Sequence, residues 1–209
     1  MLKRSLLADI NKVFDPLGFI SPVLAKGKIF VQQLSLLKLG WDTRLPKELQ
    51  NNSFYGELSA LEALRIPRRL MYSHEHIELH RFSHVSQEAY GTCVYVKTTD
   101  DHGQVTVLLY MPKSRVAPTK QTTIARLELR GAVLLMEIIV DVVDELKRMD
   151  IQVNQSSVML RTDSTIVLAW MRTIKVLCCE QSHSILDHSV QSRWKHVPTN
   201  QNSADIISR

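Results

Sequence analysis

The spacing of apolar residues changes near residue 73, and this change separates two kinds of predicted structure. Up to residue 50, apolar side chains recur three and four positions apart, which is typical of helices. The first such stripe contains Leu6, Leu7, Ile10, Val13 and Phe14. The stretch Asp-Pro-Leu-Gly at 15–18 ends this helix, because proline and glycine interrupt helical backbone. A second helix is expected from Pro22 to about Leu39, closed by Gly40.

Residues 50–72 indicate a connection with one short helix, and from residue 73 apolar and polar residues alternate. Three consecutive short strands at 76–82, 90–96 and 104–111 predict an antiparallel meander. Further elements follow in the order helix 122–149, strand 156–163, helix 164–171, strand 194–197 and a helix from 202. Thr122 or Thr123 can cap the long helix. This order predicts an α/β fold with a mixed five-stranded sheet flanked by helices.

Composition and charge narrow the function only a little. The apolar fraction of 44% is enough for a core, and the net charge of +5 favours a polyanionic partner only weakly. An odd number of cysteines, with Cys178 and Cys179 adjacent, is unlike a disulfide framework and favours a reducing compartment. We find no run of 18 apolar residues and no signal peptide, so we expect an intracellular protein, cytoplasmic or nuclear, with no membrane partner.

Three acids lie where chemistry could use them. Asp163 ends an expected strand, Glu128 lies in the first turns of the long helix, and Asp205 lies in the last helix. Each has an ordinary interpretation alone: a helix cap, a charge favoured by the helix dipole, or a surface charge. Together they suggest a centre for divalent cations, since Mg²⁺ prefers oxygen ligands. Two such ions about 4 Å apart can cleave phosphodiesters when about four carboxylates converge on them.

The later part of the chain resembles a ribonuclease H domain from a retrotransposon reverse transcriptase of the BEL/Pao class. The stretches that carry the resemblance are "IELHRFSHVSQEAYGTCVYV", "KSRVAPTKQTTIARLELRGAVLL", "RTDSTIVLAW" and "WKHVPTNQNSADIISR". Residues 1–50 resemble the helical thumb and connection that precede that domain. The resemblance therefore implies a thumb/connection-like segment at 1–50, a linker at 51–72 and a ribonuclease H-like domain at 73–209.

The resemblance also implies an active site with four acids in the order Asp, Glu, Asp, Asp. Glu128, Asp163 and Asp205 match the last three, as catalytic residues and as ligands of Mg²⁺ or Mn²⁺. The first aspartate is replaced by His84 in Phe82-Ser83-His84. A neutral imidazole offers one nitrogen and no negative charge, so we expect impaired cleavage.

Further residues implied by the resemblance would contact nucleic acid. They are Lys113, Ser114, Arg115, His196 and Asn202. Asn202 could equally be a helix N-cap. Between Trp170 and Trp194 the resemblance fades, which indicates a decaying or repurposed copy. The implied partners are an RNA–DNA hybrid, or another nucleic acid, and the rest of a retroelement polyprotein of which this chain is a fragment.

Three functions stay open at this point: a degenerate domain that binds nucleic acid, an active metal-dependent ribonuclease with a substituted ligand, or a non-catalytic interaction domain. A polymerase is not indicated, because Tyr-x-Asp-Asp is missing from the sequence. The family also carries the name Pao retrotransposon peptidase. An aspartic protease needs Asp-Thr/Ser-Gly, whereas Asp163-Ser164 precedes Thr165 here, so we do not expect peptidase activity.

Histidines allow one more interpretation. His74, His76 and His80 alternate with Glu78 on one face of the first expected strand. This pattern is either an ordinary polar strand face or a patch that binds Zn²⁺ or Mn²⁺.

Overall fold

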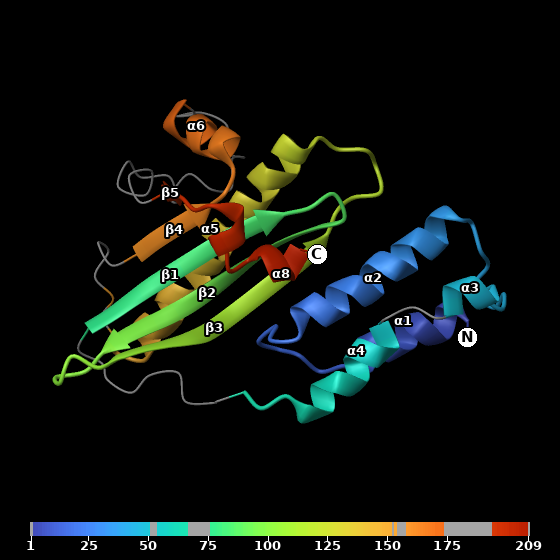
Figure 1. The fold of residues 1–209 in the computed structure, drawn as a ribbon, viewed down its shortest axis with the longest axis horizontal. Coiled ribbons are helices and arrows are strands. Elements are labelled where there is room, and N and C mark those ends of the chain that lie inside the picture. Colours follow the sequence, from blue (N-terminus) through green and yellow to red (C-terminus); the bar gives the residue numbers. More distant parts are fainter. Residues whose placement is uncertain are drawn as a thin grey trace.

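A mixed five-stranded sheet forms the centre of the chain. The structure is a computed structural model that describes residues 2–50, 54–66, 76–151, 153, 158–173 and 194–208. The strands are β1 (His76–Val85), β2 (Ala89–Thr99), β3 (Val105–Val116), β4 (Val158–Thr162) and β5 (Trp194–His196). They lie in the order β3-β2-β1-β4-β5 (Figure 1).

The strand directions confirm the predicted mixed sheet. β1 pairs with β2 and β2 with β3 in antiparallel fashion, as the meander required. β4 then pairs parallel to β1, and β5 parallel to β4, because a helix separates each from the strand before it. The strands of the meander run several residues further than their alternation predicted, and β1 carries pairing through Val85.

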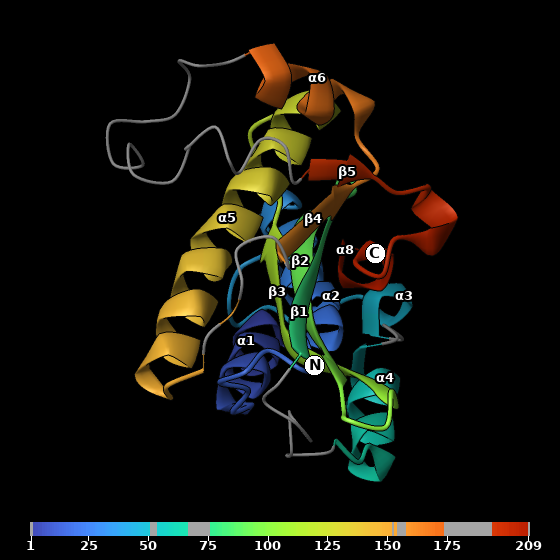
Figure 2. The ribbon, with the colours of Figure 1, turned by 90° about the vertical axis from the view of Figure 1, so that its left-hand side faces the viewer.

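One long helix, α5 (Ile124–Arg148), covers one face of the sheet (Figure 2). The Thr123 hydroxyl oxygen accepts a hydrogen bond from the Arg126 N–H at 3.4 Å, so Thr123 is the N-cap. An apolar stripe of α5 packs against β1 and β2; it contains Leu127, Leu134, Ile138, Val142 and Leu146, whereas Ile124 at the start of the helix is 39% exposed. A Cβ atom on Gly131 would lie 2.9 Å from Val85 Cγ2, so glycine permits the close approach of helix and sheet.

A second cluster lies where α5 meets α6 (Thr165–Thr173), β4 and β5. It contains Leu135, Leu160, Val167 and Trp194, all buried. The short helix α8 (Asp205–Ser208) lies on the opposite face of the sheet (Figure 2). Its Ile207 packs against β2. The last helix was expected from residue 202 and begins three residues later. The reason is a turn preceding α8, in which the Asn202 side-chain oxygen accepts from the Ala204 N–H at 3.1 Å.

The N-terminal segment is helical, as predicted, with two corrections to its boundaries. Its elements are α1 (Lys3–Lys12), α2 (Ser21–Leu36), α3 (Lys47–Gln50), α4 (Phe54–Ala60) and the 3₁₀ turn η1 (Leu61–Ala63). α1 ends before Phe14, which is 88% exposed instead of buried on the stripe. α2 ends before the predicted Leu39, because Lys38 adopts φ 55°, a left-handed conformation that cannot continue the helix.

This helical segment has its own hydrophobic core and also contacts the sheet. Leu6, Phe30, Leu34 and Phe54 are buried together. Phe54 comes from the stretch expected as a linker, so α4 packs with the preceding helices. α2 runs alongside β3 (Figure 1). The Gln32 side-chain amide of α2 donates to the Ala117 carbonyl at 2.7 Å.

Replacing Gly27 by alanine should overpack the helical core. A Cβ atom there would lie 2.7 Å from Phe54 Cε2, whereas one on Gly56 would meet nothing within 4 Å. Both glycines lie in helices, so both variants gain the same alanine propensity. We therefore expect Gly27→Ala to be less stable than Gly56→Ala by about 1–3 kcal/mol in urea unfolding. Equal stability of the two variants would contradict this packing.

Several expectations fall outside the described residues. They are the start of the fourth strand at 156–157, most of the 170–194 stretch where the resemblance fades, and His74. In the part of the chain that the structure describes, no helix is both long and apolar enough to cross a membrane.

Candidate active site

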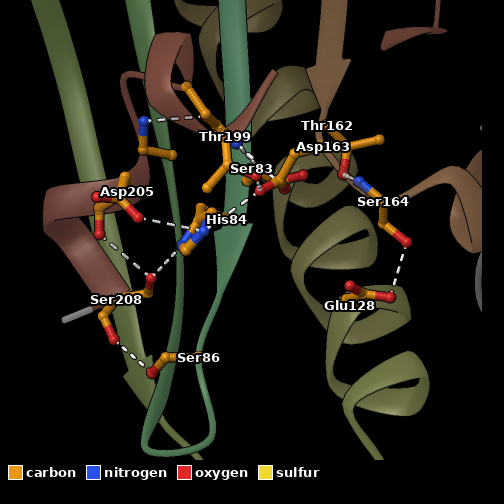
Figure 3. A network of polar contacts seen from close by, with 12 residues as sticks. Ser83, His84, Ser86, Glu128, Thr162, Asp163, Ser164, Thr199, Asp205 and Ser208 are labelled. Carbon is orange, nitrogen blue, oxygen red and sulfur yellow. Dashed lines mark hydrogen bonds and ion pairs between the residues drawn. The ribbon is translucent and has the colours of Figure 1, made fainter. Parts of the chain in front are cut away.

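His84, Asp163 and Asp205 gather at one end of the sheet, where the parallel strands β1 and β4 have their carboxyl ends, and Glu128 lies beside them (Figure 3). Ser83 of β1 pairs with Thr162 of β4, so the next residues, His84 near the end of β1 and Asp163 just after β4, lie beside each other. Thr162 also pairs with His196 of β5. Ligands of open α/β sheets bind at such an edge.

His84 occupies the middle of this group. Its Nε2 lies 3.3 Å from Asp163 Oδ2 and 3.2 Å from Asp205 Oδ1. On the other side of the ring, Nδ1 contacts the Ser208 hydroxyl (Figure 3). Carboxylates only accept hydrogen bonds, so we assign a hydrogen to Nε2. The side chain is 8% exposed, and the imidazole therefore joins three groups in a nearly closed setting.

Asp163 is held by donors from three directions. Besides His84, the Thr199 hydroxyl donates to its Oδ2 at 2.9 Å, and the Asn202 amide lies 3.3 Å from its Oδ1. Burial raises the pKa of Asp163, but the hydrogen bonds from His84 and Thr199 together with the charge of His84 outweigh it. The net pKa lies below the usual value, so this environment favours the carboxylate form.

Asp205 and Ser208 are the first and last residues of α8, and they meet His84 from the same short helix. The Ser208 hydroxyl also lies 3.3 Å from the Asp205 carbonyl, to which it can donate. The Ser86 hydroxyl donates to the Ser208 carbonyl, which ties the end of α8 to the β1–β2 turn. Sequence reasoning missed Ser208 and Thr199, because they lie more than 100 residues from β1 and no local pattern indicates such a contact.

Glu128 is placed beside this group and makes a different contact. Its Oε2 accepts a hydrogen bond of 2.7 Å from Ser164, which follows Asp163 directly. The Ser164 oxygen in turn accepts from the Val167 N–H at 3.1 Å at the start of α6. Figure 3 shows the Glu128 carboxylate directed toward Ser164 and away from His84. The structure thus gathers Asp163 and Asp205 around His84, whereas Glu128 contacts Ser164, the residue that follows Asp163.

This donor set does not fit a two-metal centre as it stands. The His84 N–H points into the gap between two carboxylates, where a bound cation would need free oxygen lone pairs. Among the described residues, no group of three or more His, Cys, Asp or Glu side chains is arranged to hold a metal ion. Metal binding by Glu128, Asp163 and Asp205 therefore stays a prediction.

Ser208, His84 and Asp205 are the residue types of a hydrolase triad and contact one another in that order. Their geometry does not support acyl transfer. Ser208 is 1% exposed, so a substrate carbonyl has no path to its oxygen. Its hydroxyl is also within reach of the Asp205 carbonyl. These contacts hold the C-terminal segment against β1.

Lys113, Ser114 and Arg115 lie near the end of β3, at the same end of the sheet as His84. In the strand register, Ser114 faces Gly91, and Gly91 faces His84. Ser114 is turned toward α2, where its hydroxyl donates to the Ser21 carbonyl at 3.3 Å. Arg115 pairs with Glu137 of α5 at 3.3 Å and is about half exposed.

His196 and Asn202 differ in their availability to a ligand. His196 is exposed on β5. Asn202 is 4% exposed, and its amide donates to the Ser83 carbonyl at 2.9 Å. Together with its turn before α8, this bond places Asn202 in a structural position between β1 and the C-terminal residues. Contact of either residue with nucleic acid stays a prediction.

The histidine face of β1 forms a network of ion pairs. Glu78 accepts from Lys97 and contacts His80 Nε2, each at 2.8 Å, while Arg161 lies 2.9 Å from His80 Nδ1. The hydrogen bonds from Lys97 and His80 lower the pKa of Glu78. Because both nitrogens of His80 are engaged by protein groups, the geometry favours a polar strand face over a metal patch.

The strand order, the mixed pairing and the polar group at the carboxyl ends define a ribonuclease H-like protein. Residues 2–164 match the family model described as Pao retrotransposon-like RNaseH-like domain. The chain belongs to this family. The match includes the helical segment and ends just after Asp163.

Comparison with solved structures finds only distant similarity. Two structures of LC11-RNase H1 match, one in complex with an RNA/DNA hybrid and one of the enzyme isolated from compost by a metagenomic approach. Their sequence identities are 18% and 19%, their TM-scores 0.35 and 0.34. The matches cover 61% and 62% of this chain and 89% of each of those chains. No curated protein matches the chain.

Proposed function

We propose that this chain binds RNA–DNA hybrids through its ribonuclease H-like fold and that its two-metal cleavage of RNA is impaired. The observation that carries the proposal is the position of His84. Its Nε2 stands 3.3 Å and 3.2 Å from the two carboxylates that a metal-dependent nuclease of this family would keep free for cations. A proton donor there stabilises the carboxylates but cannot activate water or a leaving oxygen as a metal ion does.

Support for the nucleic-acid partner comes from the placement of the polar residues along one sheet end. The row from Ser114 through Gly91 to His84 crosses three adjacent strands, which are roughly 4.8 Å apart. Lys113 flanks this row, and Lys195 and His196 are exposed on β5 at the opposite edge. A phosphate backbone lying along this end would meet basic groups at both edges.

We further propose that the helical segment corresponds to the thumb and connection of a reverse transcriptase. Its separate hydrophobic core supports a unit of its own, which α4 extends beyond residue 50. On this view the chain is part of a retroelement polyprotein and acts inside the cell, where hybrids form during reverse transcription.

Hybrid binding can be measured with a fluorescently labelled RNA–DNA duplex, by anisotropy over a series of salt concentrations. Affinity should fall as salt rises, because phosphate contacts release counterions. Lys113→Gln should weaken binding and reduce the slope of log K against log salt by about one. Lys47→Gln removes an exposed lysine of α3 in the helical segment, and this charge-matched control should bind like the unmodified chain.

Each of the other functions predicts a distinct result. Cleavage of the hybrid by the unmodified chain, abolished by Asp163→Asn, would show an active ribonuclease in which His84 is tolerated. Absence of salt-dependent binding, or equal losses in Lys113→Gln and Lys47→Gln, would contradict a nucleic-acid surface at this end of the sheet and favour an interaction domain.

A further inference from the structure

We propose that His84 takes the place of a bound cation: its ring holds Asp163 and Asp205 together and fastens the C-terminal residues 199–208 to β1. This end of the sheet is therefore closed by a side chain and needs no divalent ion to keep its structure. The inference concerns the protein without nucleic acid, so it does not depend on hybrid binding.

The contacts of residues 199–208 converge on the end of β1 and on Asp163. His84 reaches both ends of α8, because its Nε2 lies 3.2 Å from Asp205 Oδ1 and its Nδ1 contacts Ser208. Ser86 donates to the Ser208 carbonyl, and Asn202 donates to the Ser83 carbonyl at 2.9 Å. Within this set, His84 alone contacts Asp163, Asp205 and Ser208 at once.

Electrostatics explain why a donor is needed between the two acids. The side chains of Asp163 and Asp205 are 16% and 27% exposed, so water screens their mutual repulsion only partly. Two carboxylates that approach one point need a cation or a shared proton donor. The imidazole supplies that donor from a residue that is itself buried on the sheet.

The consequence is that an aspartate at position 84 should make the fold depend on metal. It would remove the ring nitrogens from Asp163, Asp205 and Ser208 and add a third carboxylate to the same space. Oxygen ligands of this kind suit Mg²⁺ and Mn²⁺, and a ligand that binds only the folded state stabilises it by mass action.

Thermal unfolding of the full chain without nucleic acid tests the proposal. The unmodified chain should have the same Tm in EDTA and in millimolar Mg²⁺. His84→Asp should have a lower Tm in EDTA and regain several degrees when Mg²⁺ or Mn²⁺ is added. His102→Asp introduces the same substitution at an exposed turn and should behave like the unmodified chain in both buffers.

The proposal is overturned if Mg²⁺ raises the Tm of the unmodified chain saturably and Asp163→Asn removes this rise, because the acids would then bind metal beside His84. A metal-independent Tm of His84→Asp also overturns it. If His84→Asp does not fold in either buffer, hydrogen exchange of Ser208→Ala decides. Faster exchange confined to residues 199–208 supports the role of His84, and unchanged exchange contradicts it.

Discussion

His84→Asp is expected to give the chain Mg²⁺-dependent cleavage of the RNA strand in an RNA–DNA hybrid, roughly 100-fold or more above the unmodified chain. The substitution replaces a proton donor by two acceptor oxygens near the end of β1, and it opens the space that the ring fills between Asp163 and Asp205. The carboxylates at positions 84, 163 and 205 would then face one space. Glu128 lies close by, where it accepts a hydrogen bond from Ser164, the residue after Asp163. The cost of turning Glu128 away from Ser164 is that of one hydrogen bond, about 1 kcal/mol.

Cleavage is measured on a labelled hybrid with purified chain, first in Mg²⁺ and then in Mn²⁺. His84→Asn is the matched control, because it removes the ring without adding a charge and should stay inactive. The double variant His84→Asp with Asp163→Asn should also be silent, which excludes a contaminating nuclease. A folded but inactive His84→Asp would show that the three remaining acids are wrongly placed, or that the departure from the family pattern at 170–194 has disabled the site.

Leu160→Ala is expected to destabilise the chain by about 2–5 kcal/mol, the largest effect on stability that we predict for one core side chain. Leu160 is 0% exposed in β4 and lies between α5, α6 and β5, in the cluster with Leu135, Val167 and Trp194. β4 is bordered by strands on both sides and α5 covers this face, so the cavity cannot collapse by a shift at the surface.

Urea unfolding of Leu160→Ala beside Leu36→Ala provides the measurement. Leu36 is the last residue of α2 and is 62% exposed, so its truncation should change the free energy of unfolding by no more than about 0.5 kcal/mol. Because Asp163 follows β4 directly, Leu160→Ala should also weaken hybrid binding at temperatures where unfolding begins. Similar losses in both leucine variants would show that β4 does not lie in the core.

The order and kind of the elements were predictable from the sequence, because they depend on local spacing. The alternation of apolar and polar residues in the β1–β3 region predicted strands, and the helical spacing of apolar residues from Leu127 to Leu146 predicted a helix. The order of these elements along the chain predicted a mixed sheet. The presence of His84 where the resemblance implies an aspartate was equally visible in the sequence. Boundaries were less accurate, because the left-handed conformation of Lys38 and the turn at Asn202 depend on hydrogen bonding and packing beyond the local pattern.

The use of each candidate side chain was decided only by the tertiary structure. Sequence reasoning placed three acids near one another, but it could not show that His84 lies between two of them while Glu128 accepts from Ser164. Nor could it find Ser208 as the partner of His84, since these residues are 124 positions apart. Contacts of that kind depend on how β1, β4 and α8 meet at one sheet end. Local periodicity determines each element, whereas packing of the whole chain determines which polar groups share a hydrogen bond.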